Sequence, residues 1–527
     1  MADLIIINSK IWTADPAQPF AEAMAVEGDK IVAVGSTKEI LKYKKDETKV
    51  LDKPGELILP GFIDSHLHFL DGGFSLSSVQ LKDAQSKEEF ISRVKSFAKD
   101  MNSGEWMLLG YWDHENWGGE MPNCEWIDEF TKDIPVFLRR CDGHMALANT
   151  AAMNAAGLTE AVKEPVGGEI GRFDNGHPSG IFKDNAMPLI SSHIPEFSME
   201  QSLKAMTAAS EYVASHGLTS VHHMGTLSDY HVFKTALEAK QMQTRIYATA
   251  PLSQFETILE KQKELGLENP MLKLNGAKIF ADGSLGSKTA AFFDPYLDEP
   301  DESGLLMDDP ENWRKGILAA DKAGLQVVVH AIGDKANNII LNFYEECIAK
   351  NGEKDRRLRI EHVQHLHPND IMRFEELGVI ASMQPWHLMD DGRWAERTIG
   401  KERAKTAYCL RSLLDNGAIL AFGSDWFVAP PVPLLGIYAA VTRLVLDGSK
   451  PDGWVPEEKI TLEEALIGYT LNGAYTSFDE DIKGSLEVGK LADFIVLDND
   501  LFTIDPEQII DVNVLYTYLG GAEISRK

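Results

Sequence analysis

The stretch Leu59-Pro-Gly-Phe-Ile-Asp-Ser-His-Leu-His68 decides how the rest of the chain is interpreted. Apolar residues follow Pro60-Gly61, so the stretch predicts a buried strand that ends at two histidines. Side chains on a strand alternate between its two faces, so His66 and His68 point the same way. Two imidazoles aimed at one point are typical of a metal site. A histidine pair with this spacing also arises by chance in a chain with 15 histidines.

Strand and helix patterns alternate downstream of this stretch. The predicted strands are Ile58–Asp64, Thr219–His223, Arg245–Thr249, Leu272–Phe280, Gln326–Val329, Arg359–His362, Val379–Met383 and Ile419–Phe422. Helical patterns lie between most of them, among them Met199–Ser215, Glu311–Ala323, Lys335–Lys350 and Pro368–Leu377. Eight strand-then-helix units in order predict an α/β fold, a parallel (β/α)8 TIM barrel. Its active site is expected at the carboxyl ends of the strands.

The two ends of the chain have a different pattern. Residues 1–58 and 481–527 contain short apolar runs split by turn residues, such as Leu4–Ile7 and Phe494–Leu497. Neither piece alone is long enough to bury much core, so we expect them to form one small β-sandwich domain together. This leaves 59–480 as the barrel. A long insertion at about 69–197, with its own strand Pro135–Arg140, is expected to form a lid or substrate wall.

Composition narrows the class of protein. A net charge of −30 argues against nucleic acid or an anionic membrane surface as partner. No apolar run reaches the roughly 18 residues that a membrane span needs. The four cysteines form no C-x-x-C pair, and the first residues lack the basic region of a secretion signal. We therefore expect a cytoplasmic protein with a small-molecule partner, and a homodimer as the default assembly.

Other predicted strands also end in groups that bind metals. Each of these residues alone has an ordinary explanation, since a single His is often a core residue and a single Asp a helix cap. Several strands that end in such groups at the same end of a barrel indicate a metal centre. The residues are His66, His68, Lys278, His330, His362 and Asp425.

Lys278 is unusual because it lies inside an apolar strand, where an unpaired charge is costly. One interpretation is a salt bridge to Asp282 or Glu361, which residue chemistry alone favours. The other is a neutral amine that reacts with CO₂ to form a carbamate, an anion with two oxygens that can bridge two divalent cations. The surrounding ligands favour the carbamate.

These motifs resemble the amidohydrolase superfamily, and more closely the metal-dependent hydrolases related to N-substituted formamide deformylase (amidohydrolase family 3). The resemblance covers nearly the full length. The motifs that carry it are 61–68, 278–287, 329–334, 360–364, 423–425 and 489–497.

The resemblance implies a binuclear metal centre. His66, His68 and Asp425 would hold one ion, His330 and His362 the other, and carbamylated Lys278 would bridge them with a hydroxide. Zinc is the expected metal for mostly imidazole ligands. Asp425 would also be catalytic, taking a proton from water and delivering it to the leaving nitrogen. The implied reaction is hydrolysis of a non-peptide C–N bond, in an amide, N-acyl amine or N-formyl amine.

The substrate contacts and the exact bond stay open. His144 resembles a family position that faces the substrate, and Trp112, Asp113, Gln364 and Trp386 are further candidates. A core or loop role is an equal alternative for most of them. The same site would also suit a cyclic amide, a carbamate or an ester, and a deaminase is a weaker possibility. A noncatalytic regulatory or binding protein on the hydrolase scaffold is the alternative from a different class.

Overall fold

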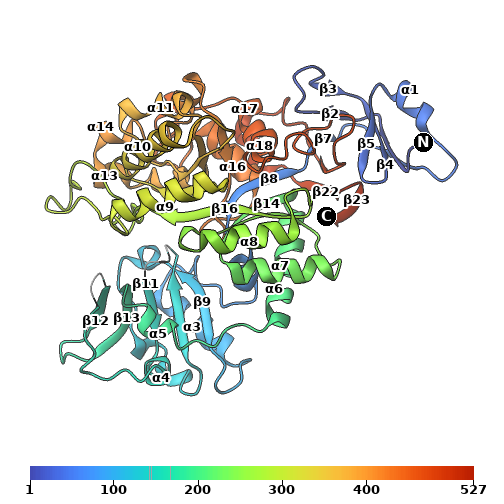
Figure 1. Cartoon of the computed structure of the whole chain (residues 1–527). Coiled ribbons are helices and arrows are strands. Elements are labelled where there is room, and N and C mark those ends of the chain that lie inside the picture. The colour runs from blue at the N-terminus through green and yellow to red at the C-terminus, as the bar shows by residue number, and fades with distance from the viewer. Residues whose placement is uncertain (142, 144, 166–167) are drawn as a thin grey trace. The chain divides into compact units, whose positions relative to one another are not determined.

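The computed structural model describes residues 1–141, 143, 145–165 and 168–527 (Figure 1). The chain divides into two compact units. The barrel unit comprises Met1–Phe69 and Thr207–Lys527, and the inserted unit comprises Leu70–Met206.

An eight-stranded parallel sheet forms the centre of the barrel unit and confirms the predicted TIM barrel. Its strands, in spatial order, are β8 (Phe62–Leu67), β14 (Leu218–Met224), β15 (Arg245–Pro251), β16 (Leu272–Phe280), β17 (Gln326–Ala331), β18 (Arg359–His362), β19 (Ile380–Met383) and β20 (Leu420–Phe422). Beyond β20, the amide of Asp425 donates to the carbonyl of His66 at 2.7 Å, and that of His68 donates to the carbonyl of Trp426 at 2.6 Å. These bonds join the first and last strands at their carboxyl ends.

The first predicted strand, Ile58–Asp64, is wrong as a single element. It is two strands, β7 (Leu57–Pro60) in a terminal sheet and β8 in the barrel, with Gly61 between them. A Cβ on Gly61 would lie 2.4 Å from the side chain of Thr219 on β14. The chain therefore changes sheets at the one residue that allows this close approach.

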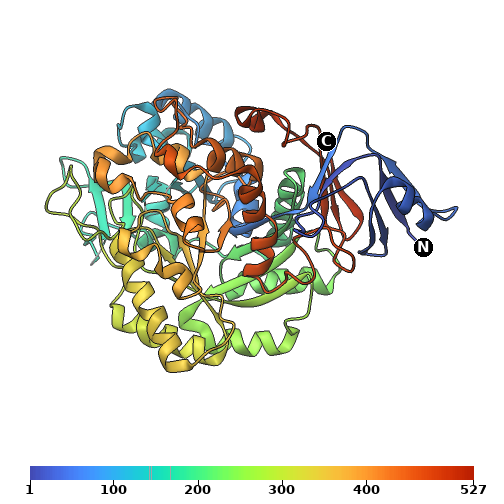
Figure 2. The same ribbon diagram turned by 90° about the horizontal axis from the view of Figure 1, so that it is seen from above.

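Helices follow the barrel strands. They are α7 (Leu227–Glu238), α8 (Phe255–Leu265), α9 (Pro310–Ala323), α10 (Asp334–Asn351), α11 (Arg373–Glu376), α12 (His387–Asp391), α13 (Ala395–Ile399), α14 (Lys401–Ala404), α15 (Leu410–Asp415), α16 (Pro433–Thr442), α17 (Leu462–Gly468) and α18 (Leu471–Thr476). Helices α9 and α10, in yellow, lie side by side in both views (Figure 2). Within the described ranges, no helix has the length and apolar character required to cross a bilayer.

The predicted helix Pro368–Leu377 is also wrong in its first half. It is a 3-10 turn, Pro368–Asp370, followed by the short helix α11. Asp370 is buried, and its carboxylate accepts from the side-chain amide of Asn338 on α10 at 3.0 Å and pairs with Arg373 at 3.0 Å. The contact with Asn338 of another helix and the local pair with Arg373 hold the chain in a turn where the local pattern favours a continuous helix.

Two further sheets share one core: the first is built from N-terminal strands, and the second combines strands from both ends of the chain. One sheet has the order β5 (Lys30–Gly35), β4 (Ala23–Glu27), β1 (Leu4–Ile7), β6 (Lys49–Asp52). The other has the order β23 (Ala522–Arg526), β22 (Val514–Leu519), β21 (Phe494–Leu497), β7, β2 (Lys10–Trp12), β3 (Phe20–Ala21). Buried side chains of both sheets pack together, among them Ile6, Met24, Ile58 and Phe494.

The inserted unit has its own five-stranded sheet and its own cores. The strand order is β12 (Gly168–Arg172), β13 (Pro178–Asp184), β11 (Met145–Ala148), β10 (Val136–Arg140), β9 (Met107–Trp112). The helices of this segment are α2 (Phe69–Leu76), α3 (Lys87–Ala98), α4 (Thr150–Ala155), α5 (Pro188–Ser191) and α6 (Met199–Ser215). The predicted strand Pro135–Arg140 corresponds to β10.

Candidate metal centre

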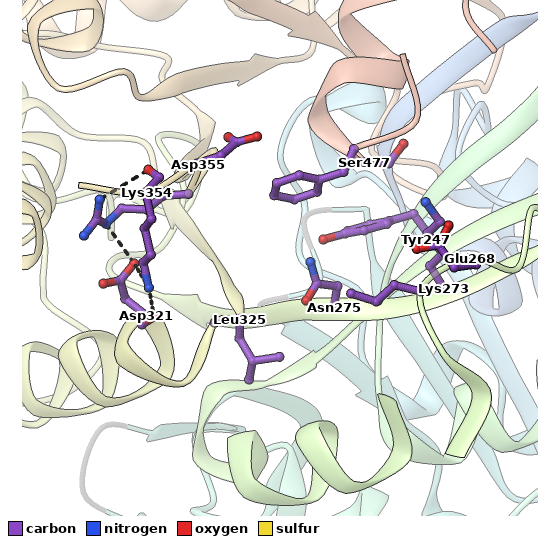
Figure 3. Close-up of a pocket in the computed structure, with 13 residues that line it drawn as sticks. Tyr247, Glu268, Lys273, Asn275, Asp321, Leu325, Lys354, Asp355 and Ser477 are labelled. Atoms are coloured by element: carbon purple, nitrogen blue, oxygen red, sulfur yellow. Dashed lines mark hydrogen bonds and ion pairs between the residues drawn. The ribbon is translucent and has the colours of Figure 1, made fainter. Parts of the chain in front are cut away.

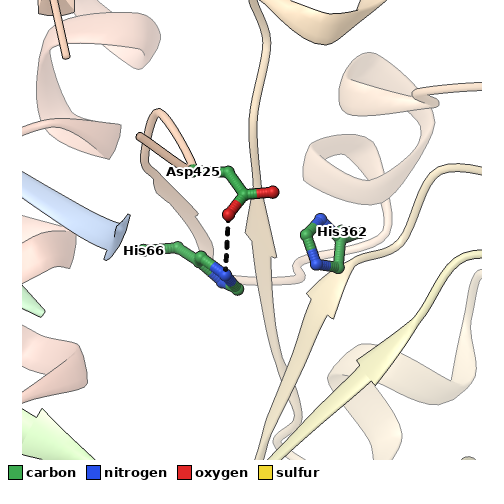
Figure 4. A group of neighbouring side chains, drawn as sticks. All are labelled: His66, His362 and Asp425. Atoms are coloured by element: carbon green, nitrogen blue, oxygen red, sulfur yellow. Dashed lines mark ion pairs between the residues drawn. The ribbon is translucent and has the colours of Figure 1, made fainter. Parts of the chain in front are cut away.

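Three of the predicted ligands lie close together, at the carboxyl ends of β8 and β18 and in the segment that follows β20. His66, His362 and Asp425 each offer a ligand atom, and these atoms lie within 4.8 Å of one another (Figure 4). All three residues are buried. The Nε2 atoms of His66 and His68 each lie 3.4 Å from Oδ1 of Asp425. The side chains of His66 and His68 therefore both point at one carboxylate.

His330 and Lys278 lie on neighbouring strands of the same barrel. The His330 ring, on β17, is 4.4 Å from the His362 ring, measured between ring centroids. Lys278, on β16, is buried, and its charge acts on His66, His330 and His362. The barrel thus gathers all six residues predicted as ligands at one end, while their ligand roles stay predictions.

Each of three histidines has one ring nitrogen bound to an oxygen acceptor. Nδ1 of His66 contacts Oε2 of Glu361 at 2.6 Å, and Nδ1 of His362 contacts Oε1 of Gln384 at 2.8 Å. Nε2 of His330 contacts the carbonyl of Gly283 at 3.1 Å. An oxygen acceptor requires a proton on the contacting nitrogen, so the other nitrogen of each neutral ring keeps its lone pair. That lone pair is what a metal ligand needs.

Lys278 makes neither of the salt bridges considered from the sequence. Its Nζ is buried and has no hydrogen-bond partner among the described residues. The oxygens of Glu361 are taken by His66 and by Nε of Arg359 at 2.9 Å. Those of Asp282 accept the backbone amides of Ile332 and Gly333 at 2.9 and 2.8 Å. Burial lowers the pKa of Lys278 to about 8, which increases the fraction of neutral amine near neutral pH.

The surroundings of Asp425 favour the ionised form of its carboxylate. Burial opposes its ionisation, but the neighbouring His66 and His68 outweigh burial and hold the pKa of Asp425 well below its usual range. Its Oδ1 atom has no hydrogen-bond partner in the described part of the chain. A buried, unsatisfied carboxylate oxygen facing imidazoles fits a cation.

Sequence reasoning missed several residues that support these ligands. Asp64 accepts the backbone amides of His66 at 3.1 Å and of Ser424 at 3.0 Å, so it joins the two ligand motifs. Burial raises the pKa of Asp64 to about 7. Gln384 directly follows β19, so the search for polar groups at strand ends would have found it if applied to the seventh strand.

The predicted substrate contacts have different outcomes. Gln364 is buried near the end of β18, and Trp386 lies just beyond β19. Trp112 is fully buried in a core of the inserted unit, where its indole N–H donates to the carbonyl of Leu138 at 2.8 Å. These contacts agree with the alternative that Trp112 is a core residue. Asp113 accepts from Arg140 at 2.9 Å, and His144 lies outside the described residues. Their substrate roles stay predictions.

Phe280 was not singled out from the sequence, although it ends β16 beside the ligands. Its ring is 5.2 Å from that of His330, and Nζ of Lys278 lies 5.1 Å from its centroid. It is 48% exposed, which is unusual for a phenylalanine next to such a polar cluster. It offers an apolar surface next to the metal centre.

A cavity of about 300 Å³ lies at the other ends of the barrel strands (Figure 3). Its lining includes Lys273 at the start of β16 and Leu325 just before β17. Its charged groups pair with one another, as when Lys354 and Arg356 contact Asp321 at 3.2 and 3.0 Å. None of the predicted metal ligands lines this cavity. The chemistry is therefore expected at the opposite end of the barrel.

Comparison with known proteins agrees with the geometry. A family model described as "Amidohydrolase family" matches residues 49–524. "Protein LONG AFTER FAR-RED 3" of Arabidopsis thaliana is 40% identical over 99% of this chain and 92% of its own length. "N-substituted formamide deformylase" of Arthrobacter pascens is 26% identical over 99% of this chain and 98% of its own length.

A solved structure has the same fold. It is described as an uncharacterized metal-dependent hydrolase from Pyrococcus furiosus, and it is 31% identical to this chain. The TM-score is 0.76, and the match covers 96% of this chain and 99% of the other. The similarity therefore extends over the barrel, the terminal strands and the inserted segment.

Proposed function

This chain belongs to the amidohydrolase family and is a metal-dependent hydrolase, and we propose that it hydrolyses a non-peptide carbon–nitrogen bond in an N-acyl or N-formyl amine. The observation that carries this proposal is Lys278, whose buried amine has no hydrogen-bond partner among the described residues and lies within a set of histidines and a carboxylate. A carbamate on this amine supplies the missing negative charge.

The carbamate forms without further protein groups. The neutral amine of Lys278 attacks CO₂, a nitrogen–carbon bond forms, and one proton is released. One C=O π bond of CO₂ breaks as this bond forms, and the product carries a single negative charge shared by two oxygens. His66, His68 and Asp425 would hold one divalent ion, His330 and His362 a second, and the carbamate would contact both. Zinc is the ion that this donor set fits best.

When bound, such ions supply a hydroxide near neutral pH and polarise the substrate carbonyl. Asp425 moves the proton: its ionised carboxylate accepts it from the attacking water and returns it to the leaving nitrogen. Departure of the amine requires this proton, because an amide anion is a very poor leaving group. Phe280 offers an apolar surface for the part of the substrate that does not react.

The test compares wild type with Lys278→Ala on a panel of N-formyl, N-acetyl and longer N-acyl amines, with metal content measured by elemental analysis. We expect about two ions per chain and hydrolysis of at least one amide class by wild type, and loss of both in Lys278→Ala. Acetate or propionate should restore part of the activity, because a free carboxylate can occupy the place of the carbamate.

Lys483→Met is the matched control. Lys483 is also a buried lysine, but it pairs with Asp479 at 3.2 Å, so its replacement should lower stability and leave metal content unchanged. Full activity of Lys278→Ala would contradict the carbamate bridge. The panel also contains a cyclic amide, a carbamate and an ester. Hydrolysis confined to these would change the assigned bond, and metal binding without any hydrolysis would favour a noncatalytic role.

A further inference from the structure

A buried charged pair lies directly behind one of the metal-ligand histidines. Arg359 and Glu361 are two residues apart on β18, and both are fully buried. Nε of Arg359 donates to Oε1 of Glu361 at 2.9 Å. The other oxygen, Oε2, lies 2.6 Å from Nδ1 of His66. The proposed hydrolysis assigns no role to Arg359 or Glu361.

Arg359 is held in place from several directions. Its Nη2 donates to the carbonyl of Ser65 at 2.6 Å and to the hydroxyl of Ser382 at 3.1 Å, and its Nη1 lies 3.0 Å from Nδ1 of His222. A guanidinium with this many partners compensates for the burial of the Glu361 carboxylate. It also orients that carboxylate, because a planar fork allows few geometries.

The carboxylate determines which nitrogen of His66 is free. An ionised carboxylate can only accept, so Nδ1 of His66 carries the proton, and in the neutral ring Nε2 carries the lone pair. Nε2 is also the atom that faces Asp425 at 3.4 Å. His362 and His330 have neutral partners in the corresponding place, the Gln384 amide and the Gly283 carbonyl. Oδ1 of Asp282 also lies 3.5 Å from Nε2 of His330, but it accepts the amide of Ile332 at 2.9 Å. Of these three histidines, His66 is therefore the one with a close hydrogen bond to a carboxylate, at 2.6 Å.

We propose that the Arg359–Glu361 pair is a positioning element that commits His66 to metal binding through Nε2. The ion held by His66 depends on this pair, and the ion held by His330 and His362 does not. This inference rests on the metal centre of the proposed function but not on its substrate or reaction.

Glu361→Gln is the informative change because it nearly preserves shape and reverses one hydrogen bond. If the amide oxygen accepts from Arg359, the amide NH₂ faces His66 and favours the tautomer with its proton on Nε2, which cannot bind metal. If the oxygen accepts from His66, the NH₂ group opposes the N–H of Arg359. Either arrangement weakens the metal-binding form of His66.

The test measures zinc retained by wild type and Glu361→Gln during dialysis against buffers of defined free zinc concentration. We expect the affinity for one ion to fall by about 10- to 100-fold, the usual size of such an effect, while the other ion is retained. Unchanged affinity for both ions would overturn the inference, and so would an equal loss of both.

Asp493→Asn is the matched control. Asp493 forms another buried carboxylate–arginine pair, with Arg245 at 2.7 and 2.9 Å, away from the ligands. The Asp493→Asn substitution should lower the melting temperature, and the variant should retain both ions. Equal metal loss in this variant would show that general destabilisation explains the effect and would overturn the inference.

A second measurement decides the matter if Glu361→Gln does not fold. In metal-free wild-type protein labelled with ¹⁵N-histidine, at a pH where the His66 ring is neutral, NMR should show its proton on Nδ1, and a neutral ring protonated on Nε2 would contradict the proposal. Neither measurement needs a substrate. If wild type binds a single ion or hydrolyses no amide, the proposed function fails, and the comparison of zinc affinities still tests the pair.

Discussion

Two of the predicted metal ligands adopt a backbone conformation that residues with side chains rarely adopt. The φ angle is 76° at His362 and 59° at Asp425. Such left-handed residues cost about 1–3 kcal/mol each and persist only where the surrounding structure imposes them. At Asp425 the constraint includes its own amide, which donates to the carbonyl of His66 at 2.7 Å. The strain lies at the chemical centre, where it aims the side chains.

Asp391 should make the stability of the protein depend on pH. Burial raises the pKa of Asp391 to about 7, with Asp390 adding to the effect and the hydroxyl of Tyr408, which donates at 2.6 Å, opposing it. The unfolded chain has the ordinary value near 4. The folded state therefore holds the proton more tightly, and the free energy of unfolding should fall as pH rises from about 4 to about 7.

Urea unfolding of metal-free protein across this pH range tests the effect of Asp391. The contribution is at most about 1.4 kcal/mol per pH unit for one proton. Asp391→Asn should remove this part of the slope, while Asp390→Asn, at a half-buried neighbour, should keep most of it. An unchanged slope in Asp391→Asn would assign the dependence to other groups.

At the scale of elements, His223 on β14 connects two strand ends. Its Nδ1 accepts the backbone amide of Phe69, the residue after His68, at 3.0 Å. Its Nε2 lies 3.2 Å from Oδ2 of Asp229, which also accepts from the amide of Thr226 at the start of α7. One imidazole thus fixes the end of β8 to the end of β14 and to the helix that follows.

We expect His223→Leu to disturb the metal centre without touching a ligand. The change leaves the amide of Phe69 and the carboxylate of Asp229 without this partner, at a cost of about 1–3 kcal/mol for each buried group. It should also loosen His68 and increase metal loss during challenge with a chelator. His231→Ala, at an exposed histidine of α7, is the control. Metal retention equal to wild type would show that β8 is held by its other contacts.

At the scale of the whole molecule, an ion pair joins the terminal strands to the strands of the barrel sheet, in addition to the chain itself. Arg245 begins β15, and Asp493 directly precedes β21. They pair through two hydrogen bonds at 2.7 and 2.9 Å, and Asp493 also accepts from the amide of Gly520 at 2.7 Å. Both side chains are buried, so the barrel strand and the terminal sheet share one internal ion pair.

Arg245→Met should lower the free energy of unfolding by about 3–5 kcal/mol, because it leaves the Asp493 carboxylate buried without its cation. The double variant Arg245→Met/Asp493→Leu should recover part of this loss, since it removes the uncompensated charge. Urea unfolding of the two single variants and the double variant measures the coupling between the residues. Additive losses would mean that the pair does not couple the two parts.

Local patterns predicted many of the elements. Leu272–Phe280, Arg359–His362 and Met199–Ser215 have the same bounds in the structure as in the prediction. The predictions were wrong where distant contacts override the local pattern. At Gly61, which lies against the side chain of Thr219, one predicted strand is two, and at Asp370, which accepts from Asn338, a predicted helix is partly a turn. The sequence did not identify Gln384 and Glu361 as hydrogen-bond partners of the ligand histidines. This role depends on which imidazole ring lies next to each of them in the folded chain.

The sequence by itself determined the barrel and the strand ends at which its chemistry is expected, because strand period, turn residues and polar strand ends are local properties. Only the tertiary structure decided which oxygen each ligand histidine faces, and that Lys278 has no hydrogen-bond partner among the described residues. His66 and Glu361 are 295 residues apart in the chain and 2.6 Å apart in space. Such distances arise only when the barrel closes, because closure brings β8 beside β20 and points their ends toward β18.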